Sequence, residues 1–485
     1  MFSRLNPKLP WLRVFGCIAC LAVLSGCVTS RAFVFARVEP NLAADCKAPV
    51  RQRDVLVTVA MSGGGSRAAL FGAAGLEALA QLSTGNGRSV LDQVGYVSAV
   101  SGGSIAASYY VLNKPPKEVS MLTADGNLTG AYRVFFDQYR DALSQSFGNE
   151  LFWRQLATFR WINPSLAAIS LTEVLHRNLL GRATLGDANR REENGDSPGL
   201  IINATVYNNG RRLAITTQSS EEFHYNYAGD LQRSLERYGK DATIAPALKE
   251  RWEQLWPITL ADLDVNPCAI DMAGAVTASA SFPPAIGPIT FQVAGSESYW
   301  HIGDGGLYEN QGVEPLLFMT LRQLQQHKIR KGLIVAFDSS FPFYVGERRL
   351  SRRAEPFSLF NFEFDRIPSI MEERATTYRS LFLRSLQLEG VFPEDAVVQV
   401  LTLRHIDAKW NADMADLPPE CAGEADAPLT PAAVNERISN IPTRLRVESL
   451  CDRQLLSAAA FKLVAQYRQQ ILDFVGAEPT VAPQP

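Results

Sequence analysis

The residue types that could do covalent chemistry lie in three short segments of the chain. In one of them, Ser101 follows an apolar run and precedes a helix-like run, with Ala99 two positions before it and Gly103 two positions after it. This arrangement is typical of a nucleophile elbow, a tight turn that tolerates only small neighbours and exposes the hydroxyl. A serine hydroxyl is a weak nucleophile and requires a base. Ser101 is therefore a candidate nucleophile whose role depends on its surroundings.

Asp304 is the candidate base. It is followed by Gly305 and Gly306 and lies between an aromatic segment and a helix that we expect to start near Gly312. A simple Asp-Gly turn is the alternative, because such turns are common in loops. His301, three residues earlier, could instead form a Ser-His-Asp triad with the serine, and chain order disfavours neither arrangement.

Gly63, Gly64 and Gly65 make up the third segment. They follow Val55 to Met61, an apolar β-branched run typical of a strand buried in a parallel sheet, and a helix-like run starts at Ser66. A glycine loop at a helix start presents unpaired N–H groups to an anion. The anion could be a phosphate or a transition-state oxyanion, although the P-loop motif is missing and the dinucleotide glycine spacing fails.

The serine segment repeats this strand–turn–helix design. We expect a strand over Gly95 to Val100 and a helix from Ile105 to Leu112, with the serine at their junction. Two such units predict that the chemistry-bearing residues lie on turns between buried strands and helices.

The three segments, in this order, resemble the motifs of the patatin-like phospholipases. Residues 63–67 are similar to the family's oxyanion motif, 99–103 to its Gly-x-Ser-x-Gly elbow, and 304–306 to its Asp-Gly-Gly/Ala motif. The stretch 278–289 resembles the one that precedes the family's aspartate. The resemblance covers roughly residues 54–340, with Ala99 and Ala68 in place of family glycines.

The resemblance implies a lipid acyl hydrolase that works without metal or cofactor. Ser101 would attack a lipid ester carbonyl, Asp304 would accept its proton, and the N–H groups of Gly64 and Gly65 would hold the oxyanion. The fold implied is α/β: a doubly wound, mainly parallel sheet with flanking helices, plus a helical insertion and a C-terminal extension. The implied site comprises the nucleophile Ser101, the base Asp304, the oxyanion-hole glycines Gly63, Gly64 and Gly65, the loop-orienting Arg67, and the elbow glycines Gly102 and Gly103.

The N-terminus has the pattern of a secretory signal peptide over residues 1–26. Basic residues precede an apolar run from Val14 to Leu24 that is too short to span a bilayer. Residues 24–27, Leu-Ser-Gly-Cys, resemble the bacterial lipobox, which implies cleavage before Cys27 and diacylation of its sulfur. A plain signal peptide with an incidental cysteine is the alternative. The residue after the cysteine is Val28 and not Asp, which by analogy with bacterial lipoprotein sorting favours the outer membrane. We therefore expect a lipid-anchored protein of the bacterial envelope that faces the periplasm.

Export makes the remaining cysteines candidates for disulfide bonds. Three pairings exist, and four free buried thiols are the alternative. The pair nearest in sequence, Cys421 with Cys451, is the first expectation. No cysteine or histidine cluster has the spacing of a zinc site. The four cysteines that remain in the mature chain are Cys46, Cys268, Cys421 and Cys451.

Composition bounds the remaining possibilities. The 485 residues are 46% hydrophobic and 20% charged with a net charge of −3, an ordinary globular balance that argues against a nucleic-acid partner. Membrane lipids are the expected partner. A catalytically idle envelope lipoprotein that binds lipid or scaffolds a complex is the alternative function. The expected divisions are a signal peptide (1–26), a linker (27–53), a catalytic domain (54–340), a mainly helical extension (341–476) and a disordered tail (477–485).

Two further segments could contact lipid. A helical insertion contains Phe152, Trp153, Phe159 and Trp161, and such spacing favours the core over a surface that dips into a membrane. Residues 341–353 mix aromatic and basic side chains, which suits either anionic headgroups or a solvated loop. Beyond them we expect a strand over Ala396 to Leu403 and a long final helix from about Asp452.

Overall fold

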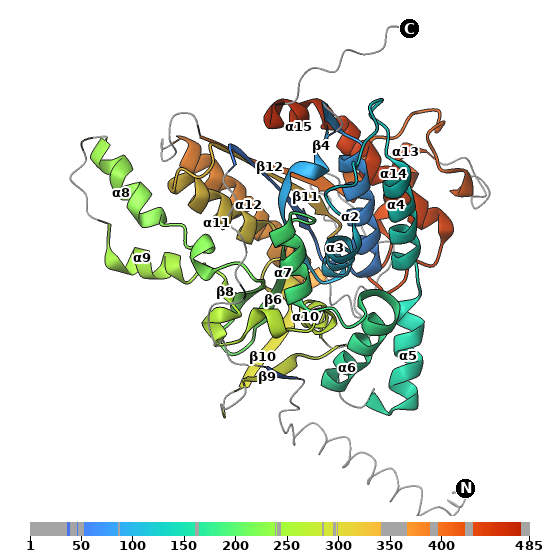
Figure 1. Ribbon diagram of the computed structural model, residues 1–485, viewed down its shortest axis with the longest axis horizontal. Helices are drawn as coiled ribbons and strands as arrows, with labels where there is room; N and C mark the ends of the chain where they lie inside the picture. Colours follow the sequence, from blue (N-terminus) through green and yellow to red (C-terminus); the bar gives the residue numbers. More distant parts are fainter. Residues whose placement is uncertain are drawn as a thin grey trace, which may run out of the picture.

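A mixed, mainly parallel sheet forms the centre of the molecule, with helices on both faces (Figure 1). Its strands run in the order β1-β9-β10-β6-β5-β2-β11-β12, and β7 and β8 branch from β6. The five strands from β6 to β12 are parallel to their neighbours, whereas β10 is antiparallel to both β6 and β9. The fold expected from the sequence, a mainly parallel α/β sheet with flanking helices, is therefore confirmed.

The structure is a computed structural model. It describes residues 36–38, 46, 53–85, 88–160, 164–237, 239, 244–283, 286–293, 297, 299–340, 366–388, 396–421 and 430–476. The strands are β1 (Ala36–Val38), β2 (Val55–Met61), β3 (Ser83–Gly85), β4 (Arg88–Ser89), β5 (Val94–Val100), β6 (Gly199–Val206), β7 (Arg211–Ile215), β8 (Ile258–Thr259), β9 (Ile289–Val293), β10 (Tyr299–Asp304), β11 (Lys331–Asp338) and β12 (Val397–Arg404). The helices are α2 (Gly65–Ala80), α3 (Gly102–Asn113), α4 (Gly130–Leu143), α5 (Phe147–Ala157), α6 (Pro164–Leu175), α7 (Leu185–Asn194), α8 (Tyr227–Arg237), α9 (Pro246–Glu253), α10 (Met272–Ser279), α11 (Val313–Gln325), α12 (Arg366–Leu388), α13 (Pro431–Ser439), α14 (Leu450–Gln466) and α15 (Arg468–Val475).

Strand β2 shows why helices cover both faces of the sheet. Its side chains alternate in direction, so Val57 and Val59 pack into one hydrophobic cluster while Leu56 and Ala60 pack into another. The first cluster includes residues of α2, α3 and α14, and the second includes residues of α11. A strand that is apolar on both faces requires cover on both, which explains the continuous apolar run in the sequence.

The C-terminal part of the chain completes the same core. Strand β12 pairs in parallel with β11 over its whole length, and α14 packs against α2. The segment after residue 341, expected as a mainly helical extension, thus adds an edge strand to the central sheet and a helix to one of its faces. The final helix starts at Leu450 and divides into α14 and α15 near Tyr467.

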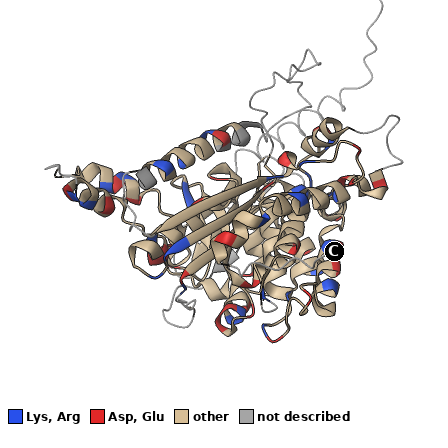
Figure 2. Cartoon of the chain, turned by 90° about the horizontal axis from the view of Figure 1, so that it is seen from above, with Lys and Arg blue, Asp and Glu red and all other residues tan. Residues whose placement is uncertain are grey.

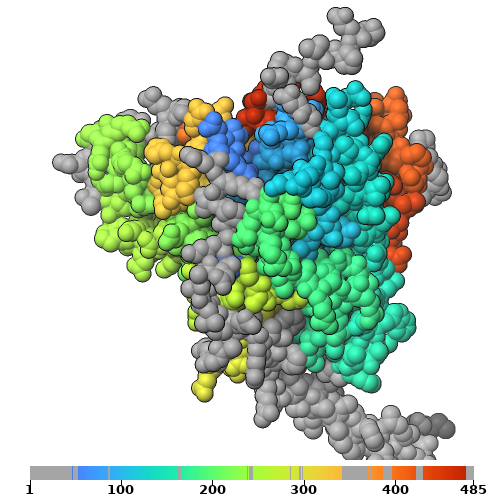
Figure 3. Space-filling model, in the orientation of Figure 1, coloured from blue at the N-terminus to red at the C-terminus, as the bar shows by residue number. Residues whose placement is uncertain are grey.

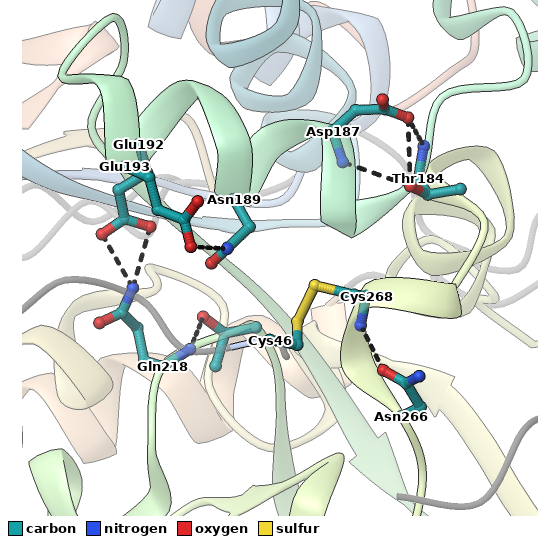
Figure 4. The surroundings of a disulfide bond; sticks show 10 residues. Cys46, Thr184, Asp187, Asn189, Glu192, Glu193, Gln218, Asn266 and Cys268 are labelled. Carbon is teal, nitrogen blue, oxygen red and sulfur yellow. Dashed lines mark hydrogen bonds between the residues drawn. A yellow bond between two sulfur atoms is a disulfide. The ribbon is translucent and has the colours of Figure 1, made fainter. Parts of the chain in front are cut away.

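The stretch expected as an N-terminal linker is tied to the body at two points. Strand β1 pairs in parallel with β9, and Cys46 forms a disulfide with Cys268 beside the start of α7 (Figure 4). The second disulfide joins Cys421 to Cys451, which confirms the first expected pairing. The signal peptide, Cys27 and the tail lie outside the described residues, as does the aromatic and basic segment 341–353.

Charged residues of both signs are spread over the helices and loops, whereas the central strands are mostly uncharged (Figure 2). Within the described residues, no helix has the length and apolar character needed to cross a bilayer. The helical insertion differs from its expectation: Phe152, Trp153 and Phe159 are 60%, 65% and 68% exposed. They are therefore surface residues and not core residues, and Trp161 lies outside the described part of the chain.

Candidate active site

Ser101 lies on a strained turn between β5 and α3. Its φ of 49° and ψ of −118° place a non-glycine residue in a sparsely populated region of backbone conformation. The turn is held by two backbone contacts: the Ser101 N–H donates to Ser279 Oγ at 2.8 Å, and the Ser101 carbonyl accepts from the Ser104 N–H at 2.9 Å. This geometry is that of a nucleophile elbow, which presents the serine side chain at the end of a strand.

The two elbow glycines are required by close packing, Gly102 against the glycine loop and Gly103 against the end of β2. A Cβ atom on Gly102 would lie 2.0 Å from the Gly65 carbonyl oxygen, and one on Gly103 would lie 2.5 Å from the Met61 carbonyl oxygen. Strands β2 and β5 are parallel neighbours, with Met61 opposite Ala99, so their carboxyl ends bring the two turns together. The sheet therefore places the elbow and the glycine loop in direct contact.

The amides of the glycine loop have different partners. The Gly63 N–H donates to the Asn310 carbonyl at 2.9 Å, and the Ser66 N–H donates to the Arg444 carbonyl at 2.8 Å. Among the described residues, no acceptor is recorded for the N–H groups of Gly64 and Gly65. Gly63 was expected to belong to the oxyanion hole, but its N–H already donates a hydrogen bond to Asn310. The candidate oxyanion donors are therefore the N–H groups of Gly64 and Gly65, which lie at the positive end of the α2 dipole.

Arg67 ties the glycine loop to a distant part of the chain. It is fully buried, and its guanidinium donates to the Ser339 carbonyl at 3.0 Å, to the Ile441 carbonyl and to Thr443 Oγ1 at 3.2 Å. We name residues 441–445 the C-terminal wall, because they close one side of the site. The Arg67 contacts and the Ser66–Arg444 hydrogen bond fix this wall against the start of α2. Arg67 therefore lies where a loop-orienting residue was expected.

Asp304 is buried at the end of β10, only 2% exposed. Its Oδ1 accepts from the Gly306 N–H at 2.7 Å, and its backbone N–H donates to the Ser281 carbonyl at 3.1 Å. In the sheet, Asp304 pairs with Ala204 on β6, one residue beyond the last pair that β6 makes with β5. The topology thus brings Asp304 beside the end of β5, where the elbow begins.

The environment of Asp304 favours its neutral form more than water does. Burial raises the pKa of its carboxyl from 3.8 to about 7, and hydrogen bonds from the Gly306 N–H and the Ser101 side chain partly oppose this rise. A carboxylate with a pKa near 7 is a far stronger base than an ordinary aspartate. Asp304 can therefore both accept a proton from Ser101 and exist ionised near neutral pH.

The stretch 278–289, which the sequence singled out, links the two candidate catalytic residues. Ser279 Oγ accepts from the Ser101 N–H and donates to the Asn203 carbonyl at 2.6 Å. Ser281, two residues on, supplies the carbonyl that accepts from the Asp304 N–H. One short segment thus fixes the backbone of both residues. The hydroxyl of Ser279 was not predicted as a site residue, and the closely spaced serines of this stretch were the available signal.

His301 lies apart from the elbow. Its Nδ1 is 3.0 Å from Thr290 Oγ1 on the neighbouring strand β9, and its backbone N–H donates to Asn208 Oδ1. Side chains alternate between the two faces of a strand, and His301 and Asp304 are three residues apart on β10. Their side chains therefore point to opposite faces of the sheet. None of the described residues that line the cavity around Ser101 is a histidine. The geometry therefore favours the dyad over the Ser-His-Asp alternative.

A cavity of about 570 Å³ contains both candidate catalytic residues. Ser101, Asp304, Gly64 and Gly65 line its floor, and its walls are mainly apolar. The sequence singled out Phe152 and the stretch 278–289 without placing them at the cavity, and it gave no signal for Leu151 or for Leu445 of the C-terminal wall. The apolar wall residues are Ile105, Leu151, Phe152, Ala280, Phe282, Ile286 and Leu445. Within the described chain, no group of three or more His, Cys, Asp or Glu side chains could hold a metal ion.

Comparison with known proteins gives a family match and several similar solved structures. A family model described as "Patatin-like phospholipase" matches residues 59–317, more than half of the chain. A search of curated proteins found no match. Among solved structures, human GIVD cytosolic phospholipase A2 is similar at 14% identity with a TM-score of 0.43, covering 98% of this chain and 65% of that chain. VipD from Legionella pneumophila is similar at 13% identity with a TM-score of 0.24, covering 66% and 57% of the two chains. The chain thus spans less than two thirds of the length of either protein.

Proposed function

Since this chain belongs to the patatin-like phospholipase family, we propose that it is a lipid acyl hydrolase that cleaves carboxylic esters of phospholipids or related lipids through a Ser-Asp dyad. The observation that supports this most is the meeting of a strained Ser101 and a buried Asp304 in one apolar cavity. Apolar walls suit an acyl chain, and the two polar residues on the floor suit its ester group.

The proposed reaction proceeds through an acyl-enzyme. Ser101 Oγ attacks the ester carbonyl carbon while its proton passes to Asp304, and the tetrahedral oxyanion accepts hydrogen bonds from the N–H groups of Gly64 and Gly65. Collapse of the intermediate expels the alcohol part of the lipid, which takes the proton from Asp304. Water then attacks the acyl-enzyme, with Asp304 again accepting a proton, and the fatty acid and the free Ser101 hydroxyl are released.

The direct test is to incubate the full chain with phospholipid vesicles and to measure free fatty acid and lysolipid by mass spectrometry. We expect both products from the wild type and neither from Ser101→Ala. If the folded wild type released no acyl chain from any phospholipid or neutral lipid in a mixed extract, an idle lipid-binding lipoprotein would be the better assignment. Transfer of the acyl chain to an added alcohol instead of water would indicate an acyltransferase.

The rate should depend on the ionisation of Asp304. Only the ionised carboxylate can accept the Ser101 proton, and burial raises the pKa of Asp304 to about 7. Because the active form is the deprotonated one, kcat/KM should rise by about tenfold per pH unit below that pKa and become level above it. Measuring kcat/KM on a soluble ester from pH 5 to pH 9 tests this. A profile that stays flat down to pH 5 would show that the base is not a buried carboxylate with a raised pKa.

We further propose that the protein is anchored in the bacterial envelope through Cys27, at the outer membrane and facing the periplasm. The support is the Leu-Ser-Gly-Cys sequence at residues 24–27 after a short apolar run. Stable anchoring requires more than one acyl chain, since a single chain binds membranes only marginally. Intact-mass analysis should find acyl groups on a mature N-terminal Cys27, and Cys27→Ser should release the protein from the membrane fraction. A wild-type chain that is unmodified and freely extractable by buffer would contradict the anchor.

A further inference from the structure

Helix α5 presents an apolar surface for which the described chain provides no cover. Phe152, Trp153 and Leu156 are 60%, 65% and 45% exposed, and Phe159 in the turn after the helix is 68% exposed. We call these four residues the α5 face. They belong to the α5–α6 segment, which protrudes at the lower right of the molecule (Figures 1 and 3). Large aromatic side chains gathered on a protruding surface are unfavourable in water and indicate an interaction site.

The charges next to the α5 face are paired with one another. Arg154 contacts Glu150 at 3.1 Å and Glu173 at 2.6 Å, and Arg160 contacts Glu173 at 3.0 Å. Arg177 also pairs with Glu150, at 3.0 Å. The pairs that Arg154 and Arg160 make with Glu173 join α5 to α6, and within the described residues each of the three arginines has a glutamate partner. Such a surface suits contact with a lipid layer, in which apolar chains are bounded by polar headgroups. Charged protein partners are instead steered by unpaired charges.

The α5 face is continuous with the candidate active site. Phe152 is exposed at the surface and also lines the cavity that contains Ser101, and Leu151 and Gln155 of the same helix line it as well. A molecule that passes from the partner bound on the α5 face into the cavity would therefore move along this helix. We thus expect that the partner that covers the α5 face also supplies the substrate.

The N-terminal anchor restricts where a membrane can lie. Strand β1 begins nine residues after Cys27, and nine extended residues span at most about 30 Å. Because β1 pairs with β9, the anchor must reach the membrane from the sheet edge drawn in the lower half of Figure 1, where α5 and α6 also lie. The tether is short enough to hold that side of the molecule against the bilayer.

We propose that the α5 face inserts into the lipid bilayer and turns the mouth of the catalytic cavity toward the membrane. This inference rests on the proposed function for its substrate and on the Cys27 anchor for its geometry. In the docked protein, Trp153, Leu156 and Phe159 lie at the boundary between headgroups and acyl chains, and Phe152 forms the border between bilayer and cavity. A phospholipid then enters the cavity acyl chain first, without crossing water.

The test replaces exposed apolar residues that do not line the cavity. Trp153→Gln combined with Leu156→Gln removes two members of the α5 face, and glutamine keeps the helix propensity. A matched control exists on α12, where Tyr378 and Leu381 have the same spacing and exposures of 58% and 62%. The control variant combines Tyr378→Gln with Leu381→Gln. Both variants and the wild type are prepared as full chains in vesicles of phosphatidylethanolamine and phosphatidylglycerol.

We expect the α5 variant to hydrolyse vesicle phospholipid at least about tenfold more slowly than the wild type, because withdrawing one large apolar side chain from a bilayer shifts docking by that factor. Hydrolysis of soluble p-nitrophenyl butyrate should stay near the wild-type rate, and the α12 control should match the wild type on both substrates. An α5 variant that hydrolyses vesicle lipid as fast as the wild type, or that loses both activities equally, overturns the proposal.

A second measurement reads docking without catalysis. Brominated phosphatidylcholine vesicles should quench part of the tryptophan fluorescence of the wild type, and Trp153→Phe should remove that part, whereas Trp252→Phe on α9 should not. Unchanged quenching in Trp153→Phe overturns the proposal. A wild-type dimer that the α5 variant converts to monomer also overturns it, since the α5 face would then bind a second copy of the chain. If the wild type hydrolyses neither substrate but Trp153 is quenched, the proposed function fails while the docking surface stands.

Discussion

Ser101→Ala and Asp304→Asn are each expected to lower kcat for ester hydrolysis by about 10⁴-fold or more, with the protein still folded. In the proposed mechanism, Ser101 supplies the bond-forming oxygen, and Asp304, the buried carboxylate beside it, takes its proton. Because the two act as one unit, the double variant should be no slower than the slower single variant. Single-turnover kinetics on a soluble ester, with circular dichroism as the check on folding, measure these losses.

The matched control for this pair is His301→Gln. His301 lies on the same strand as Asp304 but contacts Thr290 and not the elbow, so this variant should keep most of the wild-type rate. A folded His301→Gln that is as inactive as Ser101→Ala would contradict the dyad and restore the triad.

Asp304→Asn should raise the free energy of unfolding, although it removes activity. The pKa of Asp304 is raised from 3.8 to about 7 in the folded protein, so the folded state binds this proton more tightly than the unfolded state does. The free energy of unfolding therefore falls as pH increases between these values, by an amount on the order of 4 kcal/mol. Asparagine removes this cost, and the gain in stability of the variant over the wild type should be present at pH 8 and absent at pH 4.

Arg67→Ala is expected to cause the second largest loss, through position and not through contact with substrate. Without the guanidinium, the buried carbonyls of Ser339 and Ile441 lose their donor, which should lower the free energy of unfolding by about 3–5 kcal/mol. The glycine loop also loses its link to the C-terminal wall, so the amides of Gly64 and Gly65 are no longer held in place. Since the proposed role of those amides is to bind the oxyanion of the transition state, kcat should fall by about 10²-fold with little change in KM.

Arg212 provides the matched control, because it is the other fully buried arginine of the described chain. It pairs with Glu314 at 3.1 Å, stacks over Tyr308 and donates to the Leu255 carbonyl, and none of these contacts within the described chain is to the glycine loop. Arg212→Ala should destabilise the protein to a similar degree but leave kcat unchanged below the unfolding temperature. Arg67→Lys should recover part of the lost kcat. Equal effects of Arg67→Ala and Arg212→Ala on kcat would reduce Arg67 to a structural residue.

What the sequence could predict is local. The run Val55–Met61 is a strand in the structure with the same bounds as expected, since a mainly apolar run rich in β-branched residues, between a charged residue and a glycine turn, favours a buried strand. The turns at Gly63–Gly65 and Ser101 follow from the same kind of pattern, because glycine and small residues are what such turns require. The family resemblance and the fold are confirmed, whereas the catalytic roles of Ser101 and Asp304 stay predictions.

What could not be predicted depends on contacts between residues far apart in the chain. The C-terminal wall contacts the site through Arg67 and through the carbonyl of Arg444, and it lies more than 370 residues from Arg67 in the sequence. No periodicity in residues 441–445 predicts this contact. The aromatic residues of α5 have a spacing that suits a core helix, yet Phe152 and Trp153 lie at the surface, and spacing alone does not tell whether an apolar helix face is covered. Strand β12 was expected as a strand, but nothing local tells which sheet edge it joins.

The most direct measurement of the central claim is covalent labelling with a lipid-like fluorophosphonate, which reacts much faster with an activated serine than with other side chains. Intact mass and peptide mapping of the folded wild type should show one phosphonyl group, located on Ser101, and labelling should follow the pH dependence of Asp304 ionisation. Ser101→Ala should remain unlabelled, and Asp304→Asn should react at least about 10²-fold more slowly. A folded wild type that resists the reagent, or a label that persists in Ser101→Ala, would contradict the assignment of Ser101 as the nucleophile.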